Sequence, residues 1–167
     1  FVRWFVLVRA WIEADGKELR LLRRMVKNWD AGDGPVRLMV GGPLVRRSNW
    51  VWQFKKDLAL ANRFDAVSAY FAPPRSVLRS IAKLARRGHV RLITAGKSDI
   101  DATIDVARLL YNKMLSAGAH IHEFTGSKLH LKLLILDDTC YFGSANLDKR
   151  SFRINVELMV RIEDPAM

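Results

Sequence analysis

Short apolar runs alternate with amphipathic segments along this chain, and the alternation limits it to the α/β class. The run from Leu133 to Leu136 is apolar at every position, which is typical of a strand in the middle of a sheet. Strands are predicted at residues 36–40, 66–72, 90–94, 119–124, 129–136, 139–143 and 154–162, and helices at 17–29, 49–62, 76–87 and 99–117. This order predicts a mixed, mainly parallel sheet flanked by helices on both faces.

Length and composition favour one domain over residues 1–167, because 167 residues that are 50% hydrophobic can bury one core. The net charge of +11 attracts polyanions, including anionic bilayers and nucleic acids, and does not choose between them. The segment Phe1 to Ile12 is apolar, but Arg3 and Arg9 interrupt it and it is too short to span a bilayer. No transmembrane segment is therefore expected in this chain.

Several polar residues beside the apolar run can hold and attack a phosphate. His130 and Lys132 are two residues apart, so in an extended segment their side chains point the same way. A neutral imidazole is a nucleophile near neutral pH, so His130 is the candidate that forms a phosphohistidine. Gly143 lets the backbone approach closely, and Ser144 and Asn146 then offer a hydroxyl and an amide to phosphate oxygens. Lys132 and Asn146 would stabilise the transition state.

Two carboxylates complete the candidate site. Glu157 stands among apolar residues of a predicted strand, where an unpaired carboxylate is costly, and the ring Nδ1–H of His130 is its expected partner. Asp137 begins the turn after the apolar run. His120 and His122 have no further metal ligands nearby in the sequence, so we interpret them as structural and expect neither a metal nor a cofactor.

The stretch from His130 to Asn146 resembles the HKD signature of the phospholipase D superfamily, and residues 143–157 look most like bacterial cardiolipin synthases. The resemblance extends through residues 69–73, 85–92, 96–99 and 115–118, so that residues 17–163 look like the C-terminal half of such an enzyme, with residues 1–16 poorly matched. The resemblance implies a phospholipase D-like fold. In that fold His130 would be the histidine of the second motif, Lys132 and Asn146 would bind phosphate, and Ser144 would be a hydrogen-bonding neighbour. Glu157 would orient the histidine, and Asp137 would be a structural or histidine-supporting aspartate.

The chain departs from the family pattern in two ways. Five residues separate Asp137 from Gly143 where six are commoner, so the hairpin is one residue tighter. Family members also pair two HKD motifs, whereas no second His-x-Lys occurs in this sequence. Because the chain starts on Phe1, we expect an upstream part that carries the first HKD half and any membrane anchors, with the complete protein at the bacterial inner membrane.

Three functions are compatible with these residues. The first is a phosphatidyltransferase of cardiolipin synthase type, which works at a membrane surface and passes a phosphatidyl group between two anionic phosphatidylglycerol molecules through a phosphohistidine. The second is a phosphodiesterase or nuclease whose site is completed by a second copy of the chain, with nucleic acid as its partner. The third is a non-catalytic domain that binds phosphate.

Overall fold

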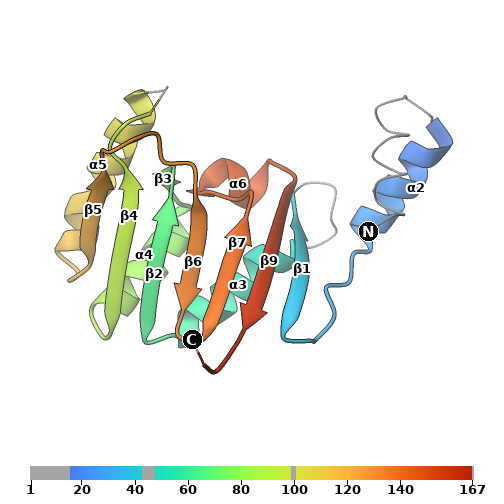
Figure 1. Ribbon diagram of the computed structural model, residues 1–167, viewed down its shortest axis with the longest axis horizontal. Helices are drawn as coiled ribbons and strands as arrows, with labels where there is room; N and C mark the ends of the chain where they lie inside the picture. Colours follow the sequence, from blue (N-terminus) through green and yellow to red (C-terminus); the bar gives the residue numbers. More distant parts are fainter. Residues whose placement is uncertain (1–15, 43–47, 99–100, 167) are drawn as a thin grey trace.

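A seven-stranded sheet forms the centre of the computed structural model, which describes residues 16–42, 48–98 and 101–166 (Figure 1). Across the sheet, the strands follow the order β1 (Val36–Gly41), β9 (Glu157–Glu163), β7 (Thr139–Gly143), β6 (Lys132–Leu136), β2 (Arg63–Ser68), β4 (His89–Ala95) and β5 (His120–Phe124). β6, which carries the apolar run, lies in the middle of this order, as predicted.

The mixed α/β fold is confirmed, but the prediction of a mainly parallel sheet is wrong. Within the seven-stranded sheet only the neighbouring pairs β2–β4 and β4–β5 are parallel, and the pairs from β2 through β6, β7 and β9 to β1 are antiparallel. Two neighbouring parallel strands need a long crossover between them, and helices supply it between β2 and β4 and between β4 and β5. After β6 the chain turns back through Asp137 and Asp138 alone, and so short a turn forces an antiparallel pair.

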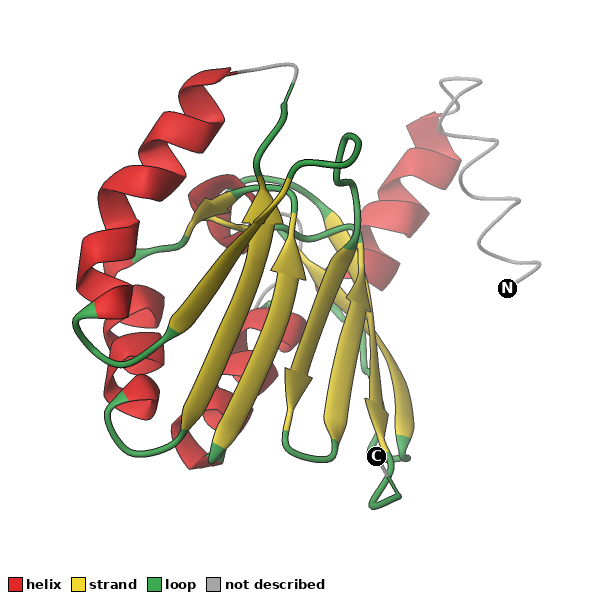
Figure 2. Cartoon of the chain, turned by 60° about the vertical axis from the view of Figure 1, so that its left-hand side comes forward, coloured by secondary structure: helices red, strands yellow, loops and turns green. Residues whose placement is uncertain are grey.

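The helices cover one face of the sheet (Figure 2). α3 (Asn49–Leu60), α4 (Arg75–Ala85) and α5 (Asp101–Leu115) contact β1, β2, β4 and β5 from this side, and α2 (Gly16–Lys27) lies beyond the β1 edge (Figure 1). The expectation of helices on both faces is therefore wrong for the part of the chain that the structure describes. On the other face, Ile93 is 38% exposed and Phe142 is 41% exposed.

The core lies between the sheet and these helices. It is built around the fully buried aromatic rings of Trp50, Phe54, Phe64 and Tyr141. Phe54 packs edge-on against Tyr141, with their ring centroids 5.9 Å apart, so α3 is fixed against the middle of the sheet.

Short elements missed by the sequence prediction shape the edge that carries the polar residues. The strand predicted at 66–72 is divided into β2 and β3 (Phe71–Ala72), and β3 pairs with β8 (Leu147–Asp148) in a separate small sheet. α6 (Lys149–Arg153) follows directly, and Asp148 caps it by accepting a hydrogen bond from the Ser151 backbone N–H at 2.8 Å. β8 and α6 form the connection between the end of β7 and the start of β9.

Strand direction brings the candidate residues to one edge of the sheet, the upper edge in Figure 1. β2, β4, β5 and β7 end there, and β6 and β9 begin there. In the described residues no helix is both long enough and apolar enough to cross a membrane.

Candidate active site

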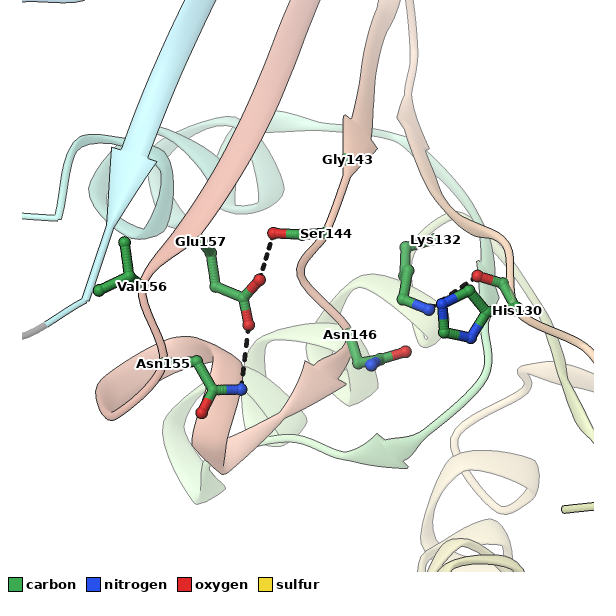
Figure 3. A pocket seen from close by; sticks show the side chains of 8 residues that line it. All are labelled: His130, Lys132, Gly143, Ser144, Asn146, Asn155, Val156 and Glu157. Carbon is green, nitrogen blue, oxygen red and sulfur yellow. Dashed lines mark hydrogen bonds between the residues drawn. The ribbon is translucent and has the colours of Figure 1, made fainter. Parts of the chain in front are cut away.

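A pocket of about 390 Å³ opens at this edge (Figure 3). It is lined by His130, Lys132, Gly143, Ser144, Asn146, Asn155, Val156 and Glu157. Three separate segments supply these residues: the approach to and start of β6, the chain after β7, and the start of β9. The structure thus brings together five of the six site residues expected from the sequence.

Lys132 is the buried cation of this pocket. Its residue is 7% exposed, and its Nζ donates a hydrogen bond to the backbone carbonyl of His130 at 2.7 Å. Desolvation lowers the pKa of Lys132 from its ordinary value, and the negative charges of Glu157 and Asp148 offset part of that effect. A partly desolvated ammonium is suited to bind a phosphate, because the attraction between opposite charges is stronger where water is excluded.

His130 lies beside Lys132, as predicted, although it is not in a strand. β6 begins only at Lys132, and residues 125–131 form an irregular segment in which His130 is exposed. Both side chains nevertheless line the same pocket and lie close together (Figure 3). The imidazole is therefore accessible from the solvent side of the phosphate-sized space.

Glu157 does not bind His130, so this expectation is wrong. Its buried carboxylate accepts hydrogen bonds from the Ser144 hydroxyl and, at 3.2 Å, from the Asn155 side-chain amide. Figure 3 shows the carboxylate turned toward these two groups, with Asn146 between it and the His130 ring. The register of β7 with β9 explains the difference, because it places Gly143 opposite Met159 and Ser144 beside the start of β9.

Backbone contacts fix Ser144 and Asn146. The Ser144 hydroxyl also accepts a hydrogen bond from the Leu158 backbone N–H at 3.0 Å. Asn146 accepts one from the Tyr70 backbone N–H at 3.3 Å, and its own N–H donates to the Ser151 hydroxyl at 3.1 Å. Figure 3 shows the Asn146 side chain extending toward His130 and Lys132 with its oxygen foremost. Its NH₂ group is a donor that an anion in the pocket can accept from.

Gly143 is needed for this arrangement, as the sequence indicated. A Cβ atom at this position would overlap the Leu158 carbonyl oxygen and would lie 2.9 Å from Met159 Cα. Only glycine lets the end of β7 approach β9 so closely. Asn155 and Tyr70, by contrast, were not predicted, because their contacts depend on strand pairing that no local spacing reveals.

Asp137 lies at the opposite end of β6, outside this pocket. It adopts a left-handed backbone conformation with φ of 46° in the two-residue turn to β7. Its carboxylate accepts hydrogen bonds from the backbone N–H groups of Asn62, at 3.1 and 3.2 Å, and Arg63, at 2.8 Å. The structure therefore does not place Asp137 where it could touch a substrate in the pocket, and its contacts are those of a residue that ties the turn to the start of β2.

The histidines interpreted as structural are not in the core. His120 and His122 are exposed on β5, and together with Arg63, His89 and Arg91 they line a hollow on the sheet face without helices. Among the described residues, no group of three or more His, Cys, Asp and Glu side chains is arranged to hold a metal ion.

Residues 56–167 match the protein family described as "Cardiolipin synthase, PLD-like domain". Cardiolipin synthase B of Salmonella typhi is 37% identical over 114 residues, which are 67% of this chain and 26% of that protein. A cardiolipin synthase of Geobacillus sp. (strain WCH70) is 29% identical over 164 residues, which are 92% of this chain and 32% of that protein. The chain thus spans about a quarter to a third of the length of these relatives.

Solved structures share the fold at lower sequence identity. The phospholipase D family member Nuc from Salmonella typhimurium superposes with a TM-score of 0.64 at 18% identity, covering 78% of this chain and 84% of Nuc. Phosphatidylserine synthase from Haemophilus influenzae Rd KW20 gives a TM-score of 0.66 at 18% identity and covers 92% of this chain and 42% of that structure. With the family match over more than half of its residues, this chain belongs to the phospholipase D superfamily and is a cardiolipin synthase-like member of it.

Proposed function

We propose that this chain supplies one half of the active site of a phosphatidyltransferase of cardiolipin synthase type. The observation that carries the proposal is the meeting of His130, Lys132 and Asn146 at one pocket, because they provide a nucleophile, a cation and an amide donor for the same phosphate. The similarity to cardiolipin synthases over residues 56–167 supports phosphatidylglycerol as the substrate. The chain acts as a single domain, and the complete protein works at the bacterial inner membrane.

The reaction proceeds in two displacements. The His130 imidazole attacks the phosphorus of one phosphatidylglycerol, a phosphorus–nitrogen bond forms, and the bond to the headgroup glycerol oxygen breaks. That oxygen takes a proton from a second histidine, and glycerol leaves. The hydroxyl of a second phosphatidylglycerol then attacks the phosphorus and gives its proton back to the second histidine, which breaks the phosphorus–nitrogen bond and releases cardiolipin. Lys132 and Asn146 stabilise the charge on the phosphoryl oxygens in both transition states.

The second histidine must come from outside this pocket. Of the four histidines in the chain, His130 alone lines it. Since the chain spans only part of its relatives, the first HKD half of a longer protein is the proposed source, and a second copy of this chain is the alternative.

The test uses the complete protein that carries this chain, with ³²P-labelled phosphatidylglycerol in vesicles as substrate. His130→Ala should lower cardiolipin formation by at least about 10³-fold, because the nucleophile is lost, and should leave the thermal midpoint almost unchanged, because the ring is exposed. The wild type should also retain an acid-labile ³²P label that the variant lacks. The matched control His89→Ala removes another exposed histidine and should retain full activity. Retained turnover in His130→Ala would contradict the proposal.

The basic charge favours a second candidate function. With 28 Lys and Arg residues against 17 Asp and Glu residues, the chain is suited to bind nucleic acid, so a homodimeric phosphodiesterase is the alternative. Cleavage of a fluorescent oligonucleotide by a species that sediments as a dimer would favour this function. A chain that binds phosphate and performs neither reaction in any assembly would instead be a binding domain.

A further inference from the structure

The sheet face without helices carries a hollow of about 470 Å³ at the edge opposite the candidate active site. It is lined by Arg63, His89, Arg91, His120 and His122. Arg63, His89 and His120 are the first residues of β2, β4 and β5, and these strands end at the edge that carries the pocket of His130 (Figure 1). The hollow is therefore separate from the candidate active site.

Strand register gathers these basic side chains. Arg63 lies opposite His89 on the neighbouring strand, and Arg91 lies opposite His120. Arg91 is two residues after His89 on β4, and His122 is two residues after His120 on β5, so the side chains of each strand point to the same face. Three adjacent strands thus direct five basic side chains into one space.

A single carboxylate holds both arginines of the hollow. Asp65 lies opposite Arg91 and two residues after Arg63 on β2. Its Oδ2 accepts a hydrogen bond from Arg63 Nε at 2.6 Å, and its Oδ1 accepts one from Arg91 Nε at 2.5 Å. The pKa of Asp65 is lowered, chiefly by the hydrogen bond from Arg91 and against an opposing effect of burial, so this carboxylate stays charged at neutral pH. Each guanidinium is therefore fixed through its Nε.

The terminal NH₂ groups of the two arginines are left for another acceptor. In the part of the chain that the structure describes they donate to no protein group, and the Arg63 and Arg91 side chains are 54% and 58% exposed. The carboxylate of Asp137 also lies near the start of β2, but it accepts from the backbone N–H groups of Asn62 and Arg63. Two guanidinium groups fixed by one carboxylate carry an excess positive charge, and the fork of N–H groups on each matches the oxygens of a phosphate.

We propose that this hollow is a second anion site, which binds a phosphate group through the terminal NH₂ groups of Arg63 and Arg91. The imidazole N–H groups of His89, His120 and His122 donate to the remaining phosphate oxygens. The hollow shares no lining residue with the pocket of the proposed transferase, so the inference does not depend on the proposed function.

Such a phosphate has two sources, a free phosphate ion and the headgroup of a phospholipid. Ile93 is two residues after Arg91, and Val67 is two residues after Asp65, so these apolar side chains lie on the same face and adjoin the hollow. A lipid with its headgroup in the hollow would place its acyl chains against Ile93 and Val67. A free phosphate would not contact them.

The first experiment is an NMR titration of this chain with inorganic phosphate, with sodium chloride at matched ionic strength as the reference. Phosphate should shift the signals of the three histidines of the hollow, and chloride should not. In Arg63→Gln/Arg91→Gln the affinity measured at these signals should fall at least about tenfold, because charge-assisted hydrogen bonds are lost. The control Arg79→Gln removes an exposed arginine on α4 and should keep the wild-type affinity.

The double glutamine variant also leaves Asp65 without its ion pairs, so a second variant tests the site with these pairs intact. His120→Ala/His122→Ala changes only exposed side chains, and its affinity for phosphate, measured at the Arg91 signals, should fall at least about threefold through the loss of two donors. Unfolding midpoints and sedimentation of the same samples check that the variants keep the fold and the oligomeric state. Unchanged affinity in either variant would overturn the site as assigned.

A second titration, with dihexanoyl phosphatidylglycerol below its micelle concentration, distinguishes the two sources. Shifts that include Ile93 and Val67, with an affinity at least about tenfold higher than that of phosphate, would assign the headgroup of a lipid. Shifts confined to the hollow, with an affinity no higher than that of phosphate, would assign a free phosphate ion. If both ligands shift only the signals of Lys132 and Asn146, the inference is overturned and the proposed function is unaffected.

Discussion

Lys132 combines a positive charge with burial, and this combination has a measurable pH signature. Its pKa is lowered from 10.5, chiefly by desolvation, so it loses its proton at a lower pH than an exposed lysine. The affinity of this chain for inorganic phosphate should therefore decline as the pH rises through that lowered pKa, below about 10.5. Calorimetric titrations with phosphate from neutral to alkaline pH would measure the decline.

Lys132→Arg is the control for this pH dependence, because a guanidinium remains charged over the whole range. The decline assigned to Lys132 should be absent from the variant, even if its affinity at neutral pH is lower because the guanidinium is larger. The same decline in both proteins would show that another group causes it.

Asp137 provides a prediction about stability. Asp137→Ala removes the acceptor of the Asn62 and Arg63 backbone N–H groups and places alanine at a φ of 46°, so it should cost about 1–3 kcal/mol of the free energy of unfolding. Urea denaturation measures this loss. Asp137→Asn keeps an acceptor oxygen and tolerates the left-handed backbone, so it should lose less.

Phosphate affinity distinguishes a structural role of Asp137 from a direct one. Because its carboxylate lies at the far end of β6 from the pocket, Asp137→Ala should bind phosphate with a Kd within about twofold of the wild type. A large loss of affinity without a loss of stability would place Asp137 in the site after all.

Local spacing predicted which residues meet, but not how each one is bonded. His130 and Lys132 are neighbours in the chain, and the Gly143–Ser144–Asn146 spacing follows from a single turn, so both groups could be recognised without tertiary information. The hydrogen-bond partner of Glu157 depends on the β7–β9 register, which sets Gly143 opposite Met159. This register cannot be predicted from a short stretch of sequence, because the two strands come from separate segments of the chain.

At the scale of elements, the positions of helices and strands were predicted better than strand direction. Apolar runs mark strands in either direction, so β2, β6 and β9 could be located while the antiparallel pairing of β2 with β6 and of β7 with β9 was missed. The two-residue turn at Asp137 and Asp138 was visible in the sequence and was the signal for an antiparallel pair. β3 was not separated from β2, and β8 and α6 were missed, because elements this short carry almost no periodicity.

A buried ion pair joins α3 to β9 and was also not predicted. Arg161 Nε donates to Asp57 Oδ2 at 2.9 Å, and the two side chains are 5% and 13% exposed. The Tyr141 hydroxyl donates to the same carboxylate oxygen, and burial, followed by the bond to Asp57, raises the pKa of Tyr141 well above its usual range. The three residues therefore form one polar network within the core.

Removing only the cation of this network should be costly. Arg161→Met leaves the Asp57 carboxylate buried without its counter-charge, so we expect a loss of about 3–5 kcal/mol in the free energy of unfolding. Adding Asp57→Leu to Arg161→Met should recover part of that loss, and a double-mutant cycle by urea denaturation gives the coupling. Strictly additive losses would mean that the pair does not act as a unit.

At the scale of the whole molecule, the sheet has one face without helices among the described elements. Register aligns a row of apolar side chains across this face: Ile93, Val67, Leu133, Phe142, Val160 and Leu38. The apolar run of β6 led to the prediction of cover on both faces, and the run does present apolar side chains to both. The sequence could not show which segment packs against the second face of the sheet. Apolar residues in a strand indicate that its surface can be buried, but they do not identify the segment that buries it.

An apolar sheet face of this kind should associate with a second copy when the chain is isolated, because burying apolar surface is favourable. Ile93→Thr/Phe142→Thr keeps strand propensity and removes two exposed apolar side chains, so self-association measured by sedimentation should weaken by at least about tenfold. The unfolding midpoint should change little, because neither side chain is part of the buried core. The control Leu109→Thr removes an 80% exposed side chain on α5 and should leave association unchanged. If the control weakens association equally, the chain associates through its helices. If the wild type sediments as a monomer at all concentrations, the sheet face does not bind a second copy of the chain.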